Sequence, residues 1–358
     1  MYGQDLYFVD EKPSTEVSYT DYAAATWSTR PVSVDHLAGV GDHDGDGWSD
    51  ALLVSNDNRE SPTGIVYGPT LDVVTAVAPV SNWDWVENGG DAGDIDGDGY
   101  EDIWLTVQAE SYNQSALMIF RGGPTRAVTT DDDADFTLTG PWGDGYRGFG
   151  QGMALVGDLD GDTIPDLAVS SPERENTIGI FSGPLSADQD WSDSTVVITG
   201  GPYIYGVGGM LALGDLDGDG ADSLIVANLG YDDDSGPTLF EVSLPLTTPA
   251  QHMNAGGDIG SFGGDYLEGM TVNDFDNDGS DDIAVTANYG EGYASYTALV
   301  TELVGPGRWS SFWMTEYGSY TAVSSGDLDN DGCMDLFVSG AYYDFDVNAT
   351  IAFVDVSR

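Results

Sequence analysis

Six short acidic segments share one pattern of aspartates, and this pattern is the part of the sequence best suited to chemistry. Each reads Asp-x-Asp-x-Asp-Gly-x-x-Asp or a close variant, and an apolar run follows at once. The segments occupy residues 42–50, 94–102, 158–166, 215–223, 274–282 and 327–335. Carboxylates at positions 1, 3 and 5 repel one another unless a cation lies between them. The six segments therefore predict six cation sites.

The expected cation is Ca²⁺, because it prefers a shell of about six to eight oxygen ligands. Glycine at position 6 in five copies suits a tight turn with positive φ. The acid at position 9 would complete the shell, together with the backbone carbonyl at position 7. The predicted calcium ligands are Asp42, Asp44, Asp46, Trp48 and Asp50; Asp94, Asp96, Asp98, Tyr100 and Asp102; Asp158, Asp160, Asp162, Ile164 and Asp166; Asp215, Asp217, Asp219, Ala221 and Asp222; Asp274, Asp276, Asp278, Ser280 and Asp282; Asp327, Asp329, Asp331, Cys333 and Asp335.

The EF-hand begins with a similar series of acids, but it requires a glutamate at position 12 and flanking helices. Position 12 is apolar in all six copies, which carry Leu or Val there inside β-type runs. The EF-hand and dockerin interpretations therefore fail, and each loop must join two strands. One copy alone could be an Asp/Gly-rich turn without metal, but six copies in register argue against that.

Two of the six loops depart from the pattern. The third has Thr163 at position 6, a β-branched residue where positive φ is expected. The fourth has Ser223 at position 9, and its acid lies one place early at Asp222. We expect these two sites to bind Ca²⁺ more weakly than the other four.

The overall charge excludes several classes of partner. The formal net charge is −53, and Lys12 is the single lysine among 358 residues. Nucleic acid is therefore a very poor partner, and anionic membrane surfaces repel the chain. No segment approaches the apolar length needed for membrane insertion. The hydrophobic content of 41% is sufficient for a folded core, so the remaining acids are expected on a solvated surface.

The single cysteine, Cys333, excludes an intrachain disulfide. Oxygen-rich calcium sites fill where Ca²⁺ is abundant, and metal can then replace disulfides as the staple of a fold. We expect an extracellular or cell-surface location. The N-terminus shows no signal peptide, because it lacks a basic start and an apolar segment. Either a leader is absent from this sequence, or the sequence is a fragment, or export is unconventional.

The acidic loops recur at intervals of 52 to 64 residues, which indicates a repeat architecture. One strand precedes each loop, a second follows it, and a third often ends in Gly-Pro, as at 179–184. A weaker fourth strand follows, as at 194–200. Four short antiparallel strands per repeat predict an all-β fold, a single β-propeller over residues 1–358 with the acidic loops between strands 1 and 2 of each blade. A β-solenoid is the alternative repeat fold, but it fits less well because its repeats are usually shorter.

The number of blades follows from the two ends of the chain. Residues 6–13 and 350–356 both carry a third-strand pattern, and the last blade lacks its fourth strand. Residues 4–19 can supply that strand by pairing with 350–356, which gives six blades. A seven-bladed ring that lacks part of one blade is the alternative.

Strand, acidic loop and strand, preceded by an aromatic-glycine pair, resemble the FG-GAP repeat of integrin α-subunit propellers and their bacterial relatives. The Phe-Gly pairs at 149–150 and 262–263 are the clearest examples. In that family the metal loop joins the first and second strands of a blade, which agrees with the position inferred from the strand pattern.

A propeller places the calcium loops on one face, so the opposite face is the expected binding surface. The loops predicted there are rich in aromatic residues, which suit contacts with a sugar or a protein. The candidate ligand-binding residues are Tyr146, Arg147, Tyr205, Tyr231, Tyr289 and Tyr343. Any one of them could instead pack between blades.

The sequence favours a binding protein over an enzyme. The three histidines are His36, His43 and His252, and no Ser-His-Asp order, zinc spacing or phosphate loop accompanies them. His43 fills position 2 of the first loop, where an apolar residue is usual, and is read as a packing substitution. We therefore expect a calcium-stabilised adhesion module for a protein or glycan ligand, which could be part of a larger surface protein. The alternatives are a glycoside hydrolase or polysaccharide lyase on a propeller scaffold, and a purely structural surface module.

Overall fold

The computed structural model describes residues 36–54, 63–67, 72–77, 85–108, 115–124, 134–140, 149–150, 152–155, 157–160, 162, 164–171, 176–200, 206–228, 238–246, 250–252, 258–261, 266–275, 278–289, 294–300, 316–317, 319–326, 335–341 and 349–354. Every regular element within these ranges is a β-strand, except the short 3-10 helix η3 (Trp191–Asp193). No helix in this part of the chain is long and apolar enough to cross a membrane.

The strands form six sheets. The first contains β1 (His36–Gly39), β2 (Ala51–Val54), β3 (Thr63–Tyr67) and β4 (Asp72–Val77), and the second β5 (Trp85–Gly93), β6 (Asp102–Gln108), β7 (Ser115–Phe120), β8 (Phe136–Thr139) and β12 (Gln189–Asp190). The third contains β9 (Met153–Leu155), β10 (Leu167–Ser171), β11 (Thr177–Phe181), β13 (Val196–Thr199) and β17 (Ala250–His252). The fourth contains β14 (Val207–Gly214), β15 (Ser223–Asn228), β16 (Thr238–Ser243) and β18 (Asp258–Ser261). The fifth contains β19 (Tyr266–Asn273), β20 (Asp282–Tyr289), β21 (Ala294–Val300) and β22 (Glu316–Tyr317), and the sixth β23 (Ser319–Gly326), β24 (Asp335–Ala341) and β25 (Ala349–Val354).

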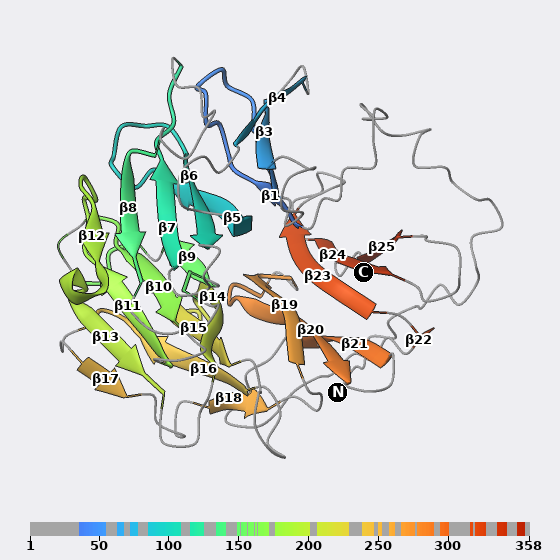
Figure 1. The fold of residues 1–358 in the computed structure, drawn as a ribbon. Helices are drawn as coiled ribbons and strands as arrows, with labels where there is room; N and C mark the ends of the chain where they lie inside the picture. Colours follow the sequence, from blue (N-terminus) through green and yellow to red (C-terminus); the bar gives the residue numbers. More distant parts are fainter. Residues whose placement is uncertain are drawn as a thin grey trace.

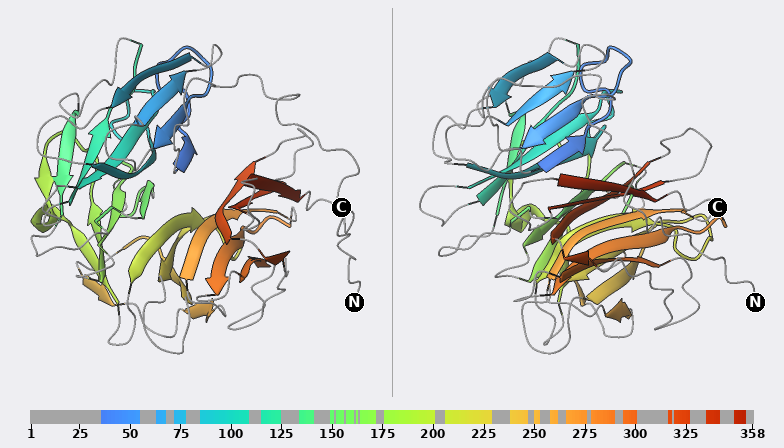
Figure 2. Two further views of the ribbon diagram at one scale, coloured as in Figure 1. Left: turned by 45° about the vertical axis from the view of Figure 1, so that its right-hand side comes forward. Right: turned by 90° about the vertical axis from the view of Figure 1, so that its right-hand side faces the viewer.

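The sheets are arranged as in a propeller. The first strand of each sheet contacts the first strand of the next, through the pairs β1–β5, β5–β9, β9–β14, β14–β19 and β19–β23. The sheets accordingly follow one another along a curved path (Figures 1 and 2). The predicted all-β architecture of antiparallel sheets is confirmed. Residues 4–19, which are predicted to close the ring, lie outside the described residues, so closure and the final blade count remain predictions.

The burial of the strands explains why short apolar runs became sheets. The central strands β6, β7, β10 and β11 are buried at every position, because neighbouring sheets cover both of their faces. The outer strands β8 and β13 alternate between buried and half-buried residues, the period of two of a strand with one face toward solvent. The core therefore lies between successive sheets, as where Leu52 of β2 packs in one cluster with Leu105 of β6.

Two short strands tie each of two sheets to the next one. β12 lies between β11 and β13 in sequence, yet it pairs in parallel with β8 of the preceding sheet. β17 follows β16 of the fourth sheet in sequence, and it pairs in parallel with β13 of the third sheet. Each becomes a fifth, outermost strand (Figure 1). The sequence did not predict these strands, since segments of two and three residues carry no periodicity.

Candidate metal centre

The acidic loops join the first and second strands of their sheets. The loops described connect β1 to β2, β5 to β6, β9 to β10, β14 to β15 and β19 to β20. The predicted position in the blade is therefore confirmed for these five. In the sixth loop, residues 327–334 lie outside the described residues and Asp335 begins β24. Asp276 of the fifth loop also lies outside them.

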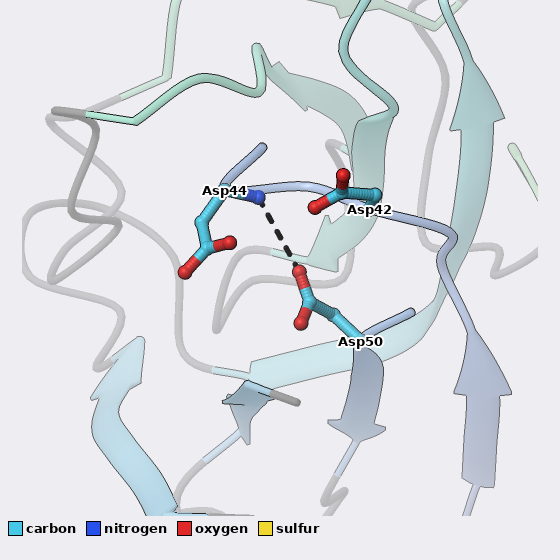
Figure 3. Close-up of side chains that lie close together, drawn as sticks. All are labelled: Asp42, Asp44 and Asp50. Carbon is cyan, nitrogen blue, oxygen red and sulfur yellow. Dashed lines mark hydrogen bonds between the residues drawn. The ribbon is translucent and has the colours of Figure 1, made fainter. Parts of the chain in front are cut away.

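Carboxylates of the first four loops converge on one point each, and in three of these loops the same positions converge. Asp42, Asp44 and Asp50 each offer an oxygen, and these oxygens lie within 4.8 Å of one another (Figure 3). The second and third loops contain the same arrangement of positions 1, 3 and 9, formed by Asp94, Asp96 and Asp102 and by Asp158, Asp160 and Asp166. The identical positions show that the loop geometry, and not a chance surface cluster, brings the acids together.

Backbone amides hold the carboxylates of positions 1 and 5 in place. In the first loop the amide of Gly47 donates to Asp42 Oδ2 at 2.9 Å, and that of Trp48 donates to Asp46 Oδ1 at 2.9 Å. The second loop repeats both bonds, with Gly99 and Tyr100 as donors. The glycine at position 6 has φ of +89° at Gly47, which confirms the left-handed turn predicted from the pattern.

The acid at position 9 links the loop to the sheet. Asp50, Asp102 and Asp166 are all buried. Asp102 Oδ2 accepts from the amide of Ile95 at 3.1 Å, and Oδ1 accepts from the amide of Gly122, just beyond β7, at 2.8 Å. Asp166 is held in the same way, between the loop and the segment that follows β11. Position 9 therefore fixes the loop against the end of the third strand.

Burial opposes ionisation of the acid at position 9. Burial raises the pKa of Asp102 to about 7, the hydrogen bonds from Gly122 and Ile95 oppose that shift, and the nearby charges of Asp96 and Asp98 add to it. Burial likewise raises the pKa of Asp166. A cation beside these groups would favour their charged forms.

The donor atoms suit a hard cation. The converging groups are carboxylate oxygens, the ligand type that Ca²⁺ prefers. Asp42 Oδ1 is buried and accepts no hydrogen bond within the described part of the chain, although Oδ2 of the same group accepts from Gly47. A buried carboxylate oxygen without a donor is costly, so this atom fits a metal-ligand role.

Consecutive loops contact one another. His43 is fully buried, and its Nδ1 donates to the carbonyl of Glu101 in the second loop at 2.8 Å. The ring of Tyr100 lies against Gly45, where a Cβ would collide with it. Loops four and five meet through Asp215 and Asp281, which exchange hydrogen bonds of 2.8 Å between backbone and backbone and between backbone and side chain. Positions 7 and 8 of one loop therefore contact the loop before it.

One of these contacts involves a residue discussed from the sequence, His43, and the others involve residues that the sequence did not indicate. His43 is buried as a packing substitution should be, and it also makes a hydrogen bond between loops, which its sequence position did not reveal. The sequence pattern did not point to Glu101 and Asp281, both at position 8, because that position varies among the six copies, which carry Ser, Glu, Pro, Asp, Asp and Met there.

The fourth loop differs from the first three as the sequence indicated. Its converging group consists of Asp215, Asp217 and Asp219, at positions 1, 3 and 5, while Asp222 is exposed. Ser223 occupies the buried position 9, and its hydroxyl donates to Glu241 Oε1 at 2.9 Å. In the third loop Thr163 lies outside the described residues, so its predicted weakness stays a prediction.

The predicted ligand-binding residues fall almost entirely outside the described ranges. Tyr289 ends β20, and only its backbone is described. Tyr146, Arg147, Tyr205, Tyr231 and Tyr343 lie outside the described residues. Their place on the face opposite the calcium loops remains a prediction.

Comparisons with known proteins support the resemblance. Residues 274–338 match the FG-GAP-like repeat family. Over 217 residues the chain is 29% identical to integrin alpha-V of Gallus gallus. The matched region covers 56% of this chain but only 20% of the integrin. These matches support an FG-GAP, integrin-like propeller family for the repeats.

Solved structures with similar folds are more distant. The Dos1 propeller is 9% identical, with a TM-score of 0.44, over 86% of this chain and 67% of its own. BBS1N, solved in complex with ARL6DN, is 13% identical, with a TM-score of 0.47, over 86% of this chain and 80% of its own.

The raised pKa of Asp102 predicts the sign of a pH effect in protein depleted of metal. An unfolded aspartate loses its proton near pH ~3.9, whereas folded Asp102 holds it up to about pH 7. The folded state therefore binds more protons between these values, and the free energy of unfolding falls as the pH rises through them. We expect metal-free protein to melt at a lower temperature at about pH 7.5 than at about pH 5.

The variant Asp102→Asn isolates this effect, because the mutual repulsion of the other acids is common to both proteins. Its melting temperature should fall less across the same pH interval, by differential scanning calorimetry. An equal fall in both proteins would contradict the assignment to Asp102.

Proposed function

We propose that this protein is a calcium-stabilised extracellular propeller of the binding or adhesion type. The observation that carries the proposal is the convergence of the carboxylates of positions 1, 3 and 9 at the same turn of successive sheets. Three repetitions of one geometry are best explained by one ligand. The likeness to an integrin α chain supports a binding module that is not an enzyme.

The residues that would hold Ca²⁺ are the acids of positions 1, 3, 5 and 9, with the carbonyl of position 7. The cation supplies positive charge where the fold places carboxylates that repel one another. The protein's own contribution is orientation, because backbone amides already fix Asp94 and Asp102. The bound cation is expected to stabilise the hairpin formed by the first two strands of a blade.

The proposed ligand surface is the face opposite the acidic loops. In a propeller the loops between second and third strands lie at the end opposite the loops between first and second strands, and the sequence of these connections carries Tyr231 and Tyr343. Aromatic side chains of this kind suit a glycan or a protein ligand. The net charge of −53 supports a partner other than nucleic acid. The proposed calcium binding and the integrin-like relative support an extracellular location.

Removal of calcium should lower the melting temperature sharply. A ligand that binds only the folded state at about 100 times its Kd stabilises it by about 2.7 kcal/mol per site. Several sites together should therefore shift the transition by many degrees, measured by calorimetry with and without a chelator. Asp102→Asn should lose part of this shift, whereas Asp222→Asn should lose much less, because Asp222 is exposed and belongs to the fourth loop, which is expected to bind Ca²⁺ more weakly. A chelator without effect on wild-type protein would refute calcium stabilisation.

Ligand binding without turnover is the expected outcome on a glycan array followed by analysis of the products. Bound glycans or proteins should be recovered unchanged, because no catalytic constellation was found in the sequence. New reducing ends or unsaturated sugars would instead support the carbohydrate-active alternative.

A further inference from the structure

The second acidic loop has an arginine on one of its converging carboxylates. Arg121 follows the last residue of β7, and its Nε lies 3.0 Å from Asp96 Oδ2 at position 3. The two side chains are mostly buried, with exposed fractions of 25% for Arg121 and 13% for Asp96. The ion pair is thus shielded from water more than an ordinary surface pair, which strengthens it.

Other contacts hold the guanidinium at this place. Arg121 Nη2 donates to the carbonyl of Leu185, in the next sheet's connection, at 3.2 Å. Its Cζ lies 5.7 Å from the centre of the Phe136 ring. The backbone amide of Arg121 donates to Asp135 Oδ2 at 2.9 Å. Arg121 is therefore held by its own sheet and by the next one, and it does not sample solvent as a free side chain would.

The equivalent position at the end of the third strand carries a neutral residue in the neighbouring sheets. Ile103 pairs with Phe120 and Leu167 pairs with Phe181, so Arg121 and Ser182 are equivalent. Ser182 Oγ donates to Asp160 Oδ2, also at position 3, at 2.9 Å. Both residues thus contact the position-3 carboxylate of their own loop.

Tyr67 has this place in the first sheet, because Ala51 pairs with Val66. Its pKa is raised by burial and then by the charges of Asp50 and Asp44, which places the phenol beside the first group of acids. Of the three sheets compared, only the second has a positive charge at this place.

We infer that Arg121 is a built-in counter-cation of the second loop, which partly substitutes for a bound metal and lowers the affinity of that site. The inference rests on the proposed calcium binding. Arginine stays charged at every pH a protein experiences, so it cannot leave the site by losing a proton. The second hairpin should therefore depend less on calcium than the first.

Two effects of Arg121 oppose each other, and the comparison with Ser182 separates them. Both residues orient the position-3 carboxylate, which favours metal binding. Only Arg121 adds a full positive charge beside a divalent cation, and that repulsion acts over a few ångströms in a partly buried site. Repulsion is therefore the net effect expected of arginine relative to serine at this one position, about tenfold on the dissociation constant of the second site.

A reciprocal exchange tests the inference by calorimetric titration of CaCl₂ into metal-depleted full-length protein. Arg121→Ser should tighten one site about tenfold, and Ser182→Arg should weaken one site about tenfold. Arg121→Lys keeps the charge and should stay near the wild-type affinity. If Arg121→Ser fails to fold, the other two variants still decide.

The variant Asp98→Asn assigns the change to the second loop, because Asp98 occupies position 5 there. The gain from Arg121→Ser should vanish in the double variant Arg121→Ser/Asp98→Asn. If the wild-type protein binds calcium and Arg121→Ser binds it with unchanged or weaker affinity, the counter-cation role is overturned and the proposed calcium binding stands. Absence of calcium binding in every variant would overturn the proposed function itself.

Discussion

Mutual repulsion among carboxylates is the constraint to which the turns between first and second strands are adapted. In three successive sheets the acids of positions 1, 3 and 9 place oxygens within 4.8 Å of one another. The backbone tolerates this because amides of the loop donate to Asp42 and Asp50, and because a glycine with positive φ reverses the chain at Gly47. Burial of position 9 raises the pKa of Asp102 to about 7, and the charges of Asp96 and Asp98 add to this shift.

The constraint extends beyond single loops, because Asp102 and Asp166 also join their loops to the segment that follows the third strand. Asp102 joins its loop to the end of β7, and the adjacent Glu101 carbonyl accepts from His43 of the preceding loop. Consecutive loops are therefore joined by direct hydrogen bonds. Arg121 also links two sheets, because it contacts Asp96 of the second loop and the carbonyl of Leu185 in the third sheet's connection.

The features that repeat were predictable from the sequence, and those that do not repeat were not. The antiparallel sheets, the place of the loops, the glycine turns and the departure at Ser223 all follow from a pattern written six times. The contacts of Glu101 and Asp281 with the preceding loops depend on how adjacent sheets are stacked. The pairing of Arg121 with Asp96 depends on strand register, which the apolar pattern fixes only to within the period of a strand. The parallel strands β12 and β17 were too short to leave a signal.

The central claim is that the acidic loops are cation sites and that the sheets are built around them. Its most direct test is the calcium content of the purified full-length protein, measured by atomic emission after equilibrium dialysis against dilute CaCl₂. The account predicts about six calcium ions per chain, one for each acidic loop, with fewer if the third and fourth loops are weak. A calcium content near zero under these conditions would contradict it.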